Sequence, residues 1–454
     1  MHDRDTIAAV STPPGRGGIG VVRVSGPDTA TIAKAIVGCL PPPRSVHYCG
    51  FSDSAGALID RGIALYFPAP ASFTGEDVLE LQGHGGPVVM DMLLAATLER
   101  GARPARPGEF TERAFLNGRV DLSQAEAVAD LIDSGSRTAA RSALASLEGV
   151  FSDRVRTLAH GLTETRAYIE ACIDFPEEEI DFLSDPQLAQ RLTSLRNQLA
   201  AIRAGAVRGV LLKEGVRVVL AGQPNVGKSS LMNLLAGRDS AIVTDIPGTT
   251  RDIIREHIQL DGLPLHVIDT AGIRAPGDAV EKHGVDRAWG AIENADALLL
   301  VIDDRAGMDD TDRDILARTP GGVTRIVINN KIDLSGVDAG AQSCDDLAAA
   351  DVVHVRLSAM TGAGIEALES TLKQCVGYES DDDGNFMARR RHLDALSRAT
   401  VAVDAADAAL RERGAGELAA EDLRQAQQAL GEITGEVSSD DLLGEIFSRF
   451  CIGK

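Results

Sequence analysis

The sequence has few aromatic residues, no long apolar run and no recognisable export signal. Aromatic side chains make up 4% of its 454 residues. No uninterrupted apolar stretch is long enough to span a bilayer, and the opening Met-His-Asp-Arg-Asp lacks the apolar core of a signal peptide. These absences predict a cytoplasmic protein that does not engage a membrane.

Cysteines are sparse and show no functional spacing. The six thiols form no CxxC pair and no Cys/His cluster with the spacing of metal ligands. A disulfide framework is not expected in so long a chain. Most of these thiols are therefore expected to be buried or incidental. They are Cys39, Cys49, Cys172, Cys344, Cys375 and Cys451.

The sequence also has fewer basic than acidic residues. The formal net charge is -22, which argues against a broad surface that grips a nucleic-acid backbone unaided. Any role on RNA needs a local basic patch or a basic partner.

The composition and the spacing of apolar residues divide the sequence into four stretches. Residues 1–118 mix β-type runs with Gly/Pro-rich turns, which predicts a compact α+β domain. Residues 119–213 and 378–454 carry apolar residues at helical spacing. Residues 214–377 alternate strands and helices, as an α/β domain does. The sequence therefore predicts a multidomain protein in which an α/β domain is inserted into a helical domain, behind an N-terminal α+β domain.

Continuous apolar runs in the third stretch predict buried parallel strands. The runs are Val216–Ala221, Leu265–Asp269, Ala297–Asp303 and Arg325–Asn329. Polar motifs stand at the ends of these strands.

The first motif, Gly222 to Ser229, has the spacing GxxxxGKS and lies between a predicted strand and a predicted helix. Its glycines let backbone N–H groups converge on phosphate oxygens at a helix N-terminus. Lys228 would reach the β- and γ-phosphates, and the Ser229 hydroxyl would coordinate Mg²⁺. The candidate phosphate-binding residues are Asn225, Val226, Gly227, Lys228, Ser229 and Ser230.

Three later motifs narrow the nucleotide to GTP. Asp269 can hold Mg²⁺ through water and the Gly272 N–H can contact the γ-phosphate. The Asp333 carboxylate can accept hydrogen bonds from guanine N1 and N2, which adenine cannot match. The candidate residues are Asp269, Thr270, Ala271 and Gly272, then Asn330, Lys331 and Asp333, and finally the base-backing Ser358 and Ala359.

The segment from Thr244 to Asp252 occupies the place of a switch loop, and an ordinary polar loop is the alternative. Thr250 would cap Mg²⁺ when the γ-phosphate is present. The candidate residues are Thr244, Asp245, Ile246, Pro247, Gly248, Thr249 and Thr250.

The water-orienting Gln of Ras-type enzymes is replaced by Ile273. The hydrolytic residue must therefore lie elsewhere. Glu281 is the candidate in the following loop, with a surface charge as the alternative.

These motifs, with others at both ends, resemble the MnmE (TrmE) family of tRNA-modifying GTPases over essentially the whole chain. The further segments that carry the likeness are Asp5 to Ile7, Thr12 to Gly18, Glu80 to Gly86, Asp121 to Ala127 and Cys451 to Lys454. The resemblance implies an N-terminal dimerisation domain that binds a tetrahydrofolate in the 5-formyl or methylene form. Carried over to this sequence, the folate contacts would be Arg23, Glu80, Arg119 and Lys454.

The resemblance also implies a homodimer that works with the FAD-dependent protein MnmG on tRNA. Together such proteins install a carboxymethylaminomethyl-type group at carbon 5 of the wobble uridine. A basic partner that carries most of the tRNA contact would suit the net charge of -22.

K⁺ is a further implied cofactor, and the resemblance also implies that G domains pair across the dimer. The matching ligands are Asn225, Thr244, Ile246 and Thr249. Glu281 falls on the family's catalytic glutamate. Pro247 stands where a small residue such as Ala is common, so the switch loop departs from the family pattern at this position.

Cys451 has two readings, a participant in the modification chemistry or a structural thiol. A regulatory GTPase of ribosome assembly and a folate-dependent one-carbon transferase regulated by GTP are the alternative functions. The first would not need the N-terminal folate-like segment or the terminal CIGK.

Overall fold

The computed structural model describes residues 5–174, 186–238, 255–260, 262–269, 288–343, 352–378, 386–437 and 440–453. These fall into two compact units. The first comprises Met1–Ala129, Leu147–Asp185 and Ala405–Lys454, and the second comprises Asp130–Ser146 and Pro186–Asp404. Among the helices of the described residues, none is both long and apolar enough to cross a membrane.

A six-stranded sheet forms the base of the first unit, in the order β3-β4-β5-β2-β1-β6. Only the pairing of β1 with the short β6 is parallel. The strands are β1 (Ile7–Val10), β2 (Gly20–Ser25), β3 (His47–Ser52), β4 (Leu58–Phe67), β5 (Val78–Gly83) and β6 (Arg103–Pro104).

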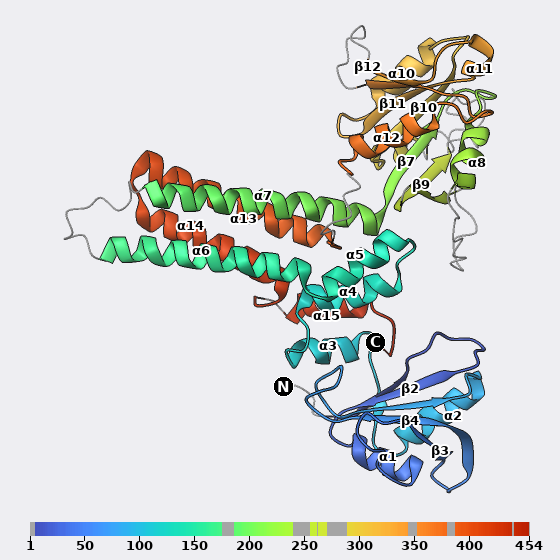
Figure 1. The fold of residues 1–454 in the computed structure, drawn as a ribbon, viewed down its shortest axis with the longest axis vertical. Helices are drawn as coiled ribbons and strands as arrows, with labels where there is room; N and C mark the ends of the chain where they lie inside the picture. The colour runs from blue at the N-terminus through green and yellow to red at the C-terminus, as the bar shows by residue number, and fades with distance from the viewer. Residues whose placement is uncertain are drawn as a thin grey trace. The chain divides into compact units, whose positions relative to one another are not determined.

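Helices α1 (Thr29–Val37) and α2 (Pro87–Leu98) cover one face of this sheet (Figure 1). Strand side chains alternate between the two faces, and those on the covered face are apolar. Val22, Leu81 and Ala64 meet Ile32 of α1 and Leu93 of α2 in one buried cluster. The core therefore lies between the sheet and the helices, and the polar Arg23 and Glu80 point to the opposite face.

Helices complete the first unit. Helices α6 (Val150–Asp174) and α14 (Gly416–Thr434) run side by side (Figure 1). Leu423, Ala426, Leu430 and Ile433, which recur at helical spacing along α14, are all buried. The helices α3 (Glu109–Leu116) and α15 (Asp440–Ser448) also pack together. Phe450 lies beyond the end of α15 and is buried.

A seven-stranded, mainly parallel sheet forms the base of the second unit, in the order β12-β13-β11-β10-β7-β9-β8. The two edge strands β12 and β8 are antiparallel to their neighbours. The strands are β7 (Val216–Ala221), β8 (Arg255–Leu260), β9 (Leu263–Asp269), β10 (Ala297–Asp303), β11 (Thr324–Asn330), β12 (Gly340–Ser343) and β13 (Val352–Arg356).

Two apolar clusters lie on the two faces of this sheet. One contains Val218, Leu299 and Ile326, and the other contains Val219, Leu298 and Val327. Both faces are thus buried, which is why the central strands read as continuous apolar runs. The helices here include α8 (Lys228–Arg238), α10 (Asp310–Arg318), α11 (Ile332–Ser335) and α12 (Ile365–Cys375), and residues 288–293 are helical as well. The remaining helices of the described chain are α4 (Leu122–Ile132), α5 (Arg137–Leu147), α7 (Pro186–Glu214) and α13 (Arg390–Arg413).

The structure confirms the predicted fold class of an α+β domain, helices and an α/β domain. The four predicted buried strands are β7, β9, β10 and β11, and the predicted helix after the GxxxxGKS motif is α8.

Candidate functional site

The GxxxxGKS loop joins the carboxyl end of β7 to the first turn of α8. Gly222 has φ 133°, and a Cβ there would lie 2.1 Å from the Val301 carbonyl oxygen. Asn225 has φ 65°, a left-handed conformation that Asn tolerates better than most residues. The turn is therefore shaped by close approach to β10 and by one left-handed asparagine. Its backbone opens at a helix N-terminus, the arrangement that suits phosphate.

Lys228 lies over this loop, and its Nζ donates to the carbonyl oxygens of Gly222 and Gln223, each at 2.8 Å. Ser229 and Ser230 are exposed in the first turn of α8. The ammonium and hydroxyl groups thus lie at the mouth of the loop. They are the groups that a phosphate and a Mg²⁺ ion require.

Asn330 connects two loops. One is the GxxxxGKS loop, Gly222 to Ser229, called the phosphate loop below, and the other is the predicted base-backing loop at Ser358 and Ala359. The Asn330 Nδ2 donates to the Val226 carbonyl at 2.8 Å, and its Oδ1 accepts from the Ala359 N–H at 2.9 Å. The side chain is 2% exposed. A Cβ at Gly227 would lie 2.3 Å from this Nδ2, so the close contact requires glycine. One buried amide therefore holds three of the predicted motifs together.

Asp333 is exposed in the first turn of α11. The Ser358 hydroxyl donates to its Oδ1 at 2.6 Å, which fixes the carboxylate and leaves Oδ2 for a ligand. Ser358 itself is buried, 1% exposed. A fixed carboxylate at this position can accept from the paired donors of guanine.

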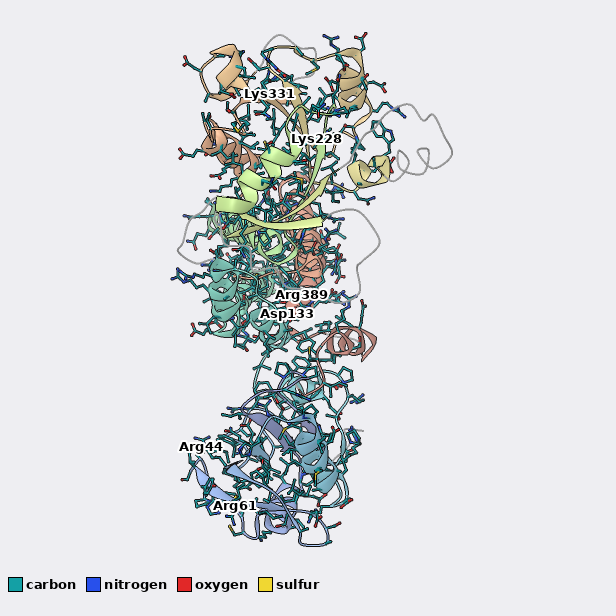
Figure 2. All side chains as sticks on the ribbon, turned by 90° about the vertical axis from the view of Figure 1, so that its right-hand side faces the viewer. Arg44, Arg61, Asp133, Lys228, Lys331 and Arg389 are labelled. Carbon is teal, nitrogen blue, oxygen red and sulfur yellow. The ribbon has the colours of Figure 1, made fainter. Side chains whose placement is uncertain are left out.

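Lys331 brings the loop after β11 and the phosphate loop together from another side. Its Nζ donates to the Asn225 carbonyl at 2.7 Å and to Asp303 Oδ2 at 3.0 Å. The Arg305 guanidinium, assisted by Lys331, holds the pKa of Asp303 well below its usual range despite partial desolvation. Figure 2 labels Lys228 and Lys331, which both belong to the domain built on the seven-stranded sheet.

Asp269 ends β9, next to the end of β7 in the sheet. Twelve other predicted site residues lie outside the described residues. They are Thr244, Asp245, Ile246, Pro247, Gly248, Thr249, Thr250, Thr270, Ala271, Gly272, Glu281 and Lys454.

The N-terminal domain brings Arg23 and Glu80 together on neighbouring strands. They are register partners in β2 and β5, and the guanidinium donates twice to Glu80 Oε1, at 3.0 and 2.9 Å. Phe73 and Phe110 each have their ring centroid 5.7 Å from the Arg23 guanidinium carbon. The two side chains are 24% and 17% exposed, so the pair is reachable and has apolar rings beside it.

Arg119 and the C-terminal segment belong to the same unit as this pair. The Arg119 side chain passes Gly75, where an added Cβ would lie 3.2 Å from its Cγ. The exposed Cys451 accepts a hydrogen bond from the Gly108 N–H through its carbonyl, at 3.3 Å. Gly453 lies against β1, and its Cβ would meet the Val10 carbonyl at 2.4 Å. The chain end is therefore attached to the N-terminal domain.

Several of these residues were missed from the sequence. Asp303 is the last residue of a predicted buried strand and Arg305 follows it. Polar residues at the carboxyl end of a parallel strand are a signal that could have identified them. Phe73 and Phe110 carry no local signal, because their place beside Arg23 depends on contacts distant in sequence.

Two family models match the chain. One, described as the GTP-binding protein TrmE N-terminus, matches residues 6–119, and the other, described as the MnmE helical domain, matches residues 122–451. The tRNA modification GTPase MnmE of Chromohalobacter salexigens is 56% identical over 459 residues, which cover 100% of this chain and 99% of the relative. The protein of the same name from Nitrosococcus oceani is 55% identical over 450 residues, covering 99% and 97%.

Among solved structures, Aquifex aeolicus Era bound to GDP·AlF4⁻ is 26% identical, with a TM-score of 0.28, and covers 41% of this chain and 66% of that one. The G domain of Thermotoga maritima FeoB is 26% identical, with a TM-score of 0.26, and covers 35% and 98%. The family models and the full-length relatives are decisive: this chain belongs to the MnmE (TrmE) family of tRNA modification GTPases.

Proposed function

We propose that this chain is a K⁺-activated GTP hydrolase that acts in tRNA wobble-uridine modification. With an FAD-dependent, MnmG-like partner it adds a carboxymethylaminomethyl-type group to carbon 5 of that uridine. The observation that carries the nucleotide part is the buried Asn330 amide, which holds the phosphate loop against the base-backing Ser358–Ala359 loop. The family membership carries the tRNA part.

GTP and Mg²⁺ fit the residues present. GTP supplies the phosphoanhydride that is cleaved. The N–H groups from Asn225 to Ser229 would hold its phosphates, and the Ser229 hydroxyl, with Asp269 and Thr250, would serve Mg²⁺. Asp333, fixed by Ser358, would select guanine. Glu281 would orient the attacking water in place of the absent Gln at position 273.

K⁺ would be held by oxygen ligands of the phosphate loop and the switch loop. The proposed ligands are Asn225, Thr244, Ile246 and Thr249. Asn225 is the one of these within the described residues, and it has a left-handed backbone, φ 65°, although it is not a glycine. A cation here would neutralise charge that develops on the phosphates, as an arginine finger does elsewhere.

A tetrahydrofolate would bind at the Arg23–Glu80 pair, with Arg119 and Lys454 as further contacts. The donor and acceptor set suits the group, because a pterin can donate to a carboxylate and a glutamate tail pairs with cations. Phe73 beside Arg23 is exposed and adds the apolar surface that a flat ring needs. We further propose the domain limits 1–118, 119–213, 214–377 and 378–454, a homodimer, a cytoplasmic location and tRNA contact mainly through the partner.

The test is mass spectrometry of tRNA nucleosides from cells that lack this protein. We expect the wobble-uridine modification to disappear and to return with the wild-type gene. It should not return with Lys228→Ala, because loss of the phosphate-binding ammonium abolishes turnover. Unchanged wobble uridines in the deletion strain would contradict the function. Full rescue by a variant shown to be unable to hydrolyse GTP would favour the folate-transferase alternative.

A further inference from the structure

Two thiols and one imidazole meet between α1 and β3 in the N-terminal domain. Helix α1 ends at Val37, and Gly38, with φ 85°, turns the chain out of the helix. Cys39 follows directly and is exposed. His47 begins β3, and its Nε2 lies 3.5 Å from the Cys39 sulfur. No motif in the sequence predicts this contact.

Cys49 is the third member of the group. It lies two residues beyond His47 on β3, so both side chains point to the same face, the one that α1 covers. The thiol is half-buried against the core and donates to the His47 carbonyl at 3.6 Å. Burial, and then the neighbouring Cys39 sulfur, raise the pKa of Cys49. The two thiols are therefore unlike each other, one exposed beside a base and one protected.

This arrangement separates the roles of a reactive thiol and a resolving thiol. Reactive cysteines are accessible and lie beside a group that can take their proton. Cys451 offers an internal comparison, because it is also exposed, yet among the described residues no histidine is hydrogen-bonded to its sulfur.

We propose that Cys39 and Cys49 form a peroxide-sensitive pair in which His47 is the general base. The proposal concerns the N-terminal domain alone and does not depend on GTP turnover or tRNA modification. It departs from the expectation that most of the cysteines are buried or incidental.

The chemistry balances with a peroxide as the oxidant. With its own proton on Nδ1, His47 accepts the Cys39 thiol proton at Nε2. The thiolate attacks one peroxide oxygen, an S–O bond forms and the O–O bond breaks. The leaving oxygen takes the proton from His47 and departs as water or an alcohol. Cys39 is thereby oxidised by two electrons to a sulfenic acid.

Cys49 then resolves this product. Its sulfur attacks the Cys39 sulfur, an S–S bond forms, and the S–O bond breaks. The hydroxyl group leaves as water with the Cys49 proton. The disulfide would join the end of α1 to β3, which is an edge strand of the sheet.

The sequence makes the product easy to detect in the full-length protein. Trypsin cleaves after Lys34, Arg44 and Arg61, so Cys39 and Cys49 fall on adjacent peptides, 35–44 and 45–61. After treatment with one equivalent of hydrogen peroxide at neutral pH, non-reducing mass spectrometry should find these two peptides linked. Cys39 should be oxidised faster than Cys451, the exposed thiol on a separate peptide.

Two variants test the roles. In His47→Gln the oxidation of Cys39 should slow by roughly 100-fold, at the low end of general-base contributions. In Cys49→Ser the Cys39 sulfenic acid should persist and react with a dimedone-type probe. Circular dichroism checks that both variants fold.

The proposal fails if Cys39 is oxidised no faster than Cys451 in the wild type. It also fails if His47→Gln leaves the rate unchanged, or if peptides 35–44 and 45–61 are not linked. Because GTP turnover and tRNA nucleosides are measured separately, these outcomes are independent of the proposed function.

Discussion

At the scale of single residues, Asn330 shows how one amide can hold a binding site together. Both of its polar atoms are engaged, one by the Val226 carbonyl and one by the Ala359 N–H. A buried polar group left without its partner costs about 1–3 kcal/mol. The phosphate loop and the base loop are therefore positioned by the same side chain, so a change at either is felt by the other.

Asp333→Asn should weaken GTP binding and relax guanine selectivity. The carboxylate is held by Ser358 at 2.6 Å. Replacing one of its oxygens by an NH₂ group puts a donor, in place of an acceptor, opposite the guanine donors. Loss of a charged hydrogen bond costs about 1.5–3 kcal/mol, or roughly 10- to 150-fold in affinity. The affinity of this variant for xanthine nucleotides should rise, because the oxygen at C2 of xanthine can accept a hydrogen bond from the Asn amide.

The measurement is equilibrium binding of fluorescent guanine and xanthine nucleotides. Asp338→Asn is the matched control, since Asp338 is an exposed carboxylate in the same region and should leave both affinities unchanged. Unaltered base selectivity in Asp333→Asn would mean that the base pocket lies elsewhere.

At the scale of elements, an ion-pair network attaches α3 to the sheet of the N-terminal domain. Glu109, in the first turn of α3, is 2% exposed and accepts from Arg103 Nη1 at 2.8 Å and Nη2 at 2.6 Å. Arg113, one turn later, reaches Asp5 at 2.7 Å and Glu76 at 3.1 Å. Burial alone would raise the pKa of Glu109, but these cations and the Arg106 N–H lower it to about 2.

The attachment of α3 should therefore weaken in acid. Above the ordinary glutamate pKa of 4.5, the Glu109 carboxylate is ionised in both states and its stabilisation is fully present. As the pH falls from there toward about 2, the unfolded chain binds a proton that the folded chain does not, and the stabilisation is lost. A pKa lowered this far corresponds to about 3 kcal/mol.

Hydrogen exchange of the α3 amides can measure this effect by comparing wild type with Glu109→Gln at each pH. Intrinsic exchange rates cancel in that comparison. The extra protection of the wild type should be large at pH 5 and shrink toward pH 2. Glu99→Gln serves as the control, because Glu99 is exposed at the C-terminal end of α2 in the same domain. A pH-independent difference would show that the Glu109 charge contributes nothing.

The β8–β9 hairpin connects the two predicted nucleotide-sensing segments to α5. The predicted switch loop precedes β8, and the motif that begins with Asp269 follows β9. At the turn, the Gly262 carbonyl accepts from the Ser136 hydroxyl at 3.0 Å. Ser136 also accepts from the Ala139 N–H at 3.1 Å, which caps the start of α5. One hydroxyl therefore links the hairpin turn to a helix.

Gly262→Ala should destabilise this connection. Gly262 has φ 83°, and its Cβ would lie 2.4 Å from Thr138 Oγ1. Backbone strain and the steric conflict together should cost about 1–3 kcal/mol. The single tryptophan of the chain, Trp289, lies in the same unit, so fluorescence-detected urea unfolding reports the loss.

Gly237→Ala provides the matched control, because it should change the free energy of unfolding in the opposite direction. Gly237 lies within α8 and an added Cβ has nothing within 4 Å. Alanine there should stabilise by about 0.5–1 kcal/mol. If Gly262→Ala were as stable as the wild type, the turn would not depend on its left-handed glycine.

The same elements show what the sequence could predict. Strands β7 and β10 were predicted with their full bounds, because a strand buried on both faces is a continuous apolar run. The edge strand β8, Arg-Glu-His-Ile-Gln-Leu, was missed because it mixes charged and apolar residues. Its pairing with β9 and the hydrogen bond from Ser136 to the hairpin turn at Gly262 are long-range contacts that no local pattern encodes.

At the scale of the whole molecule, a site can be predicted from the sequence when its residues lie in short motifs, and not when they are scattered along the chain. Lys228, Asn330 and Asp333 belong to short strings at strand ends, and topology brings strand ends together. The Arg23–Glu80 pair joins residues 57 positions apart, and only the resemblance to a family identified it. The thiol pair with His47 had neither a motif nor a resemblance, so it appeared only in the structure.

The final prediction joins the nucleotide site to the proposed dimer. If K⁺ is bound by Asn225 and the switch loop where two G domains pair, GTP turnover should be much faster in K⁺ than in Na⁺. It should also rise with protein concentration, because pairing completes the site. Na⁺ is smaller and would leave some of these oxygens too distant to coordinate it.

Steady-state phosphate release in KCl and in NaCl tests this prediction. The wild type is compared with two variants, Glu281→Ala and Asn225→Ala. Glu281→Ala should keep nucleotide affinity and lose turnover in both salts, whereas Asn225→Ala should lose mainly the K⁺ advantage. A wild type equally fast in both salts would remove the cation from the mechanism. Turnover unaffected by Glu281→Ala would instead make that residue a surface charge, because a group that orients the attacking water cannot be removed without slowing hydrolysis.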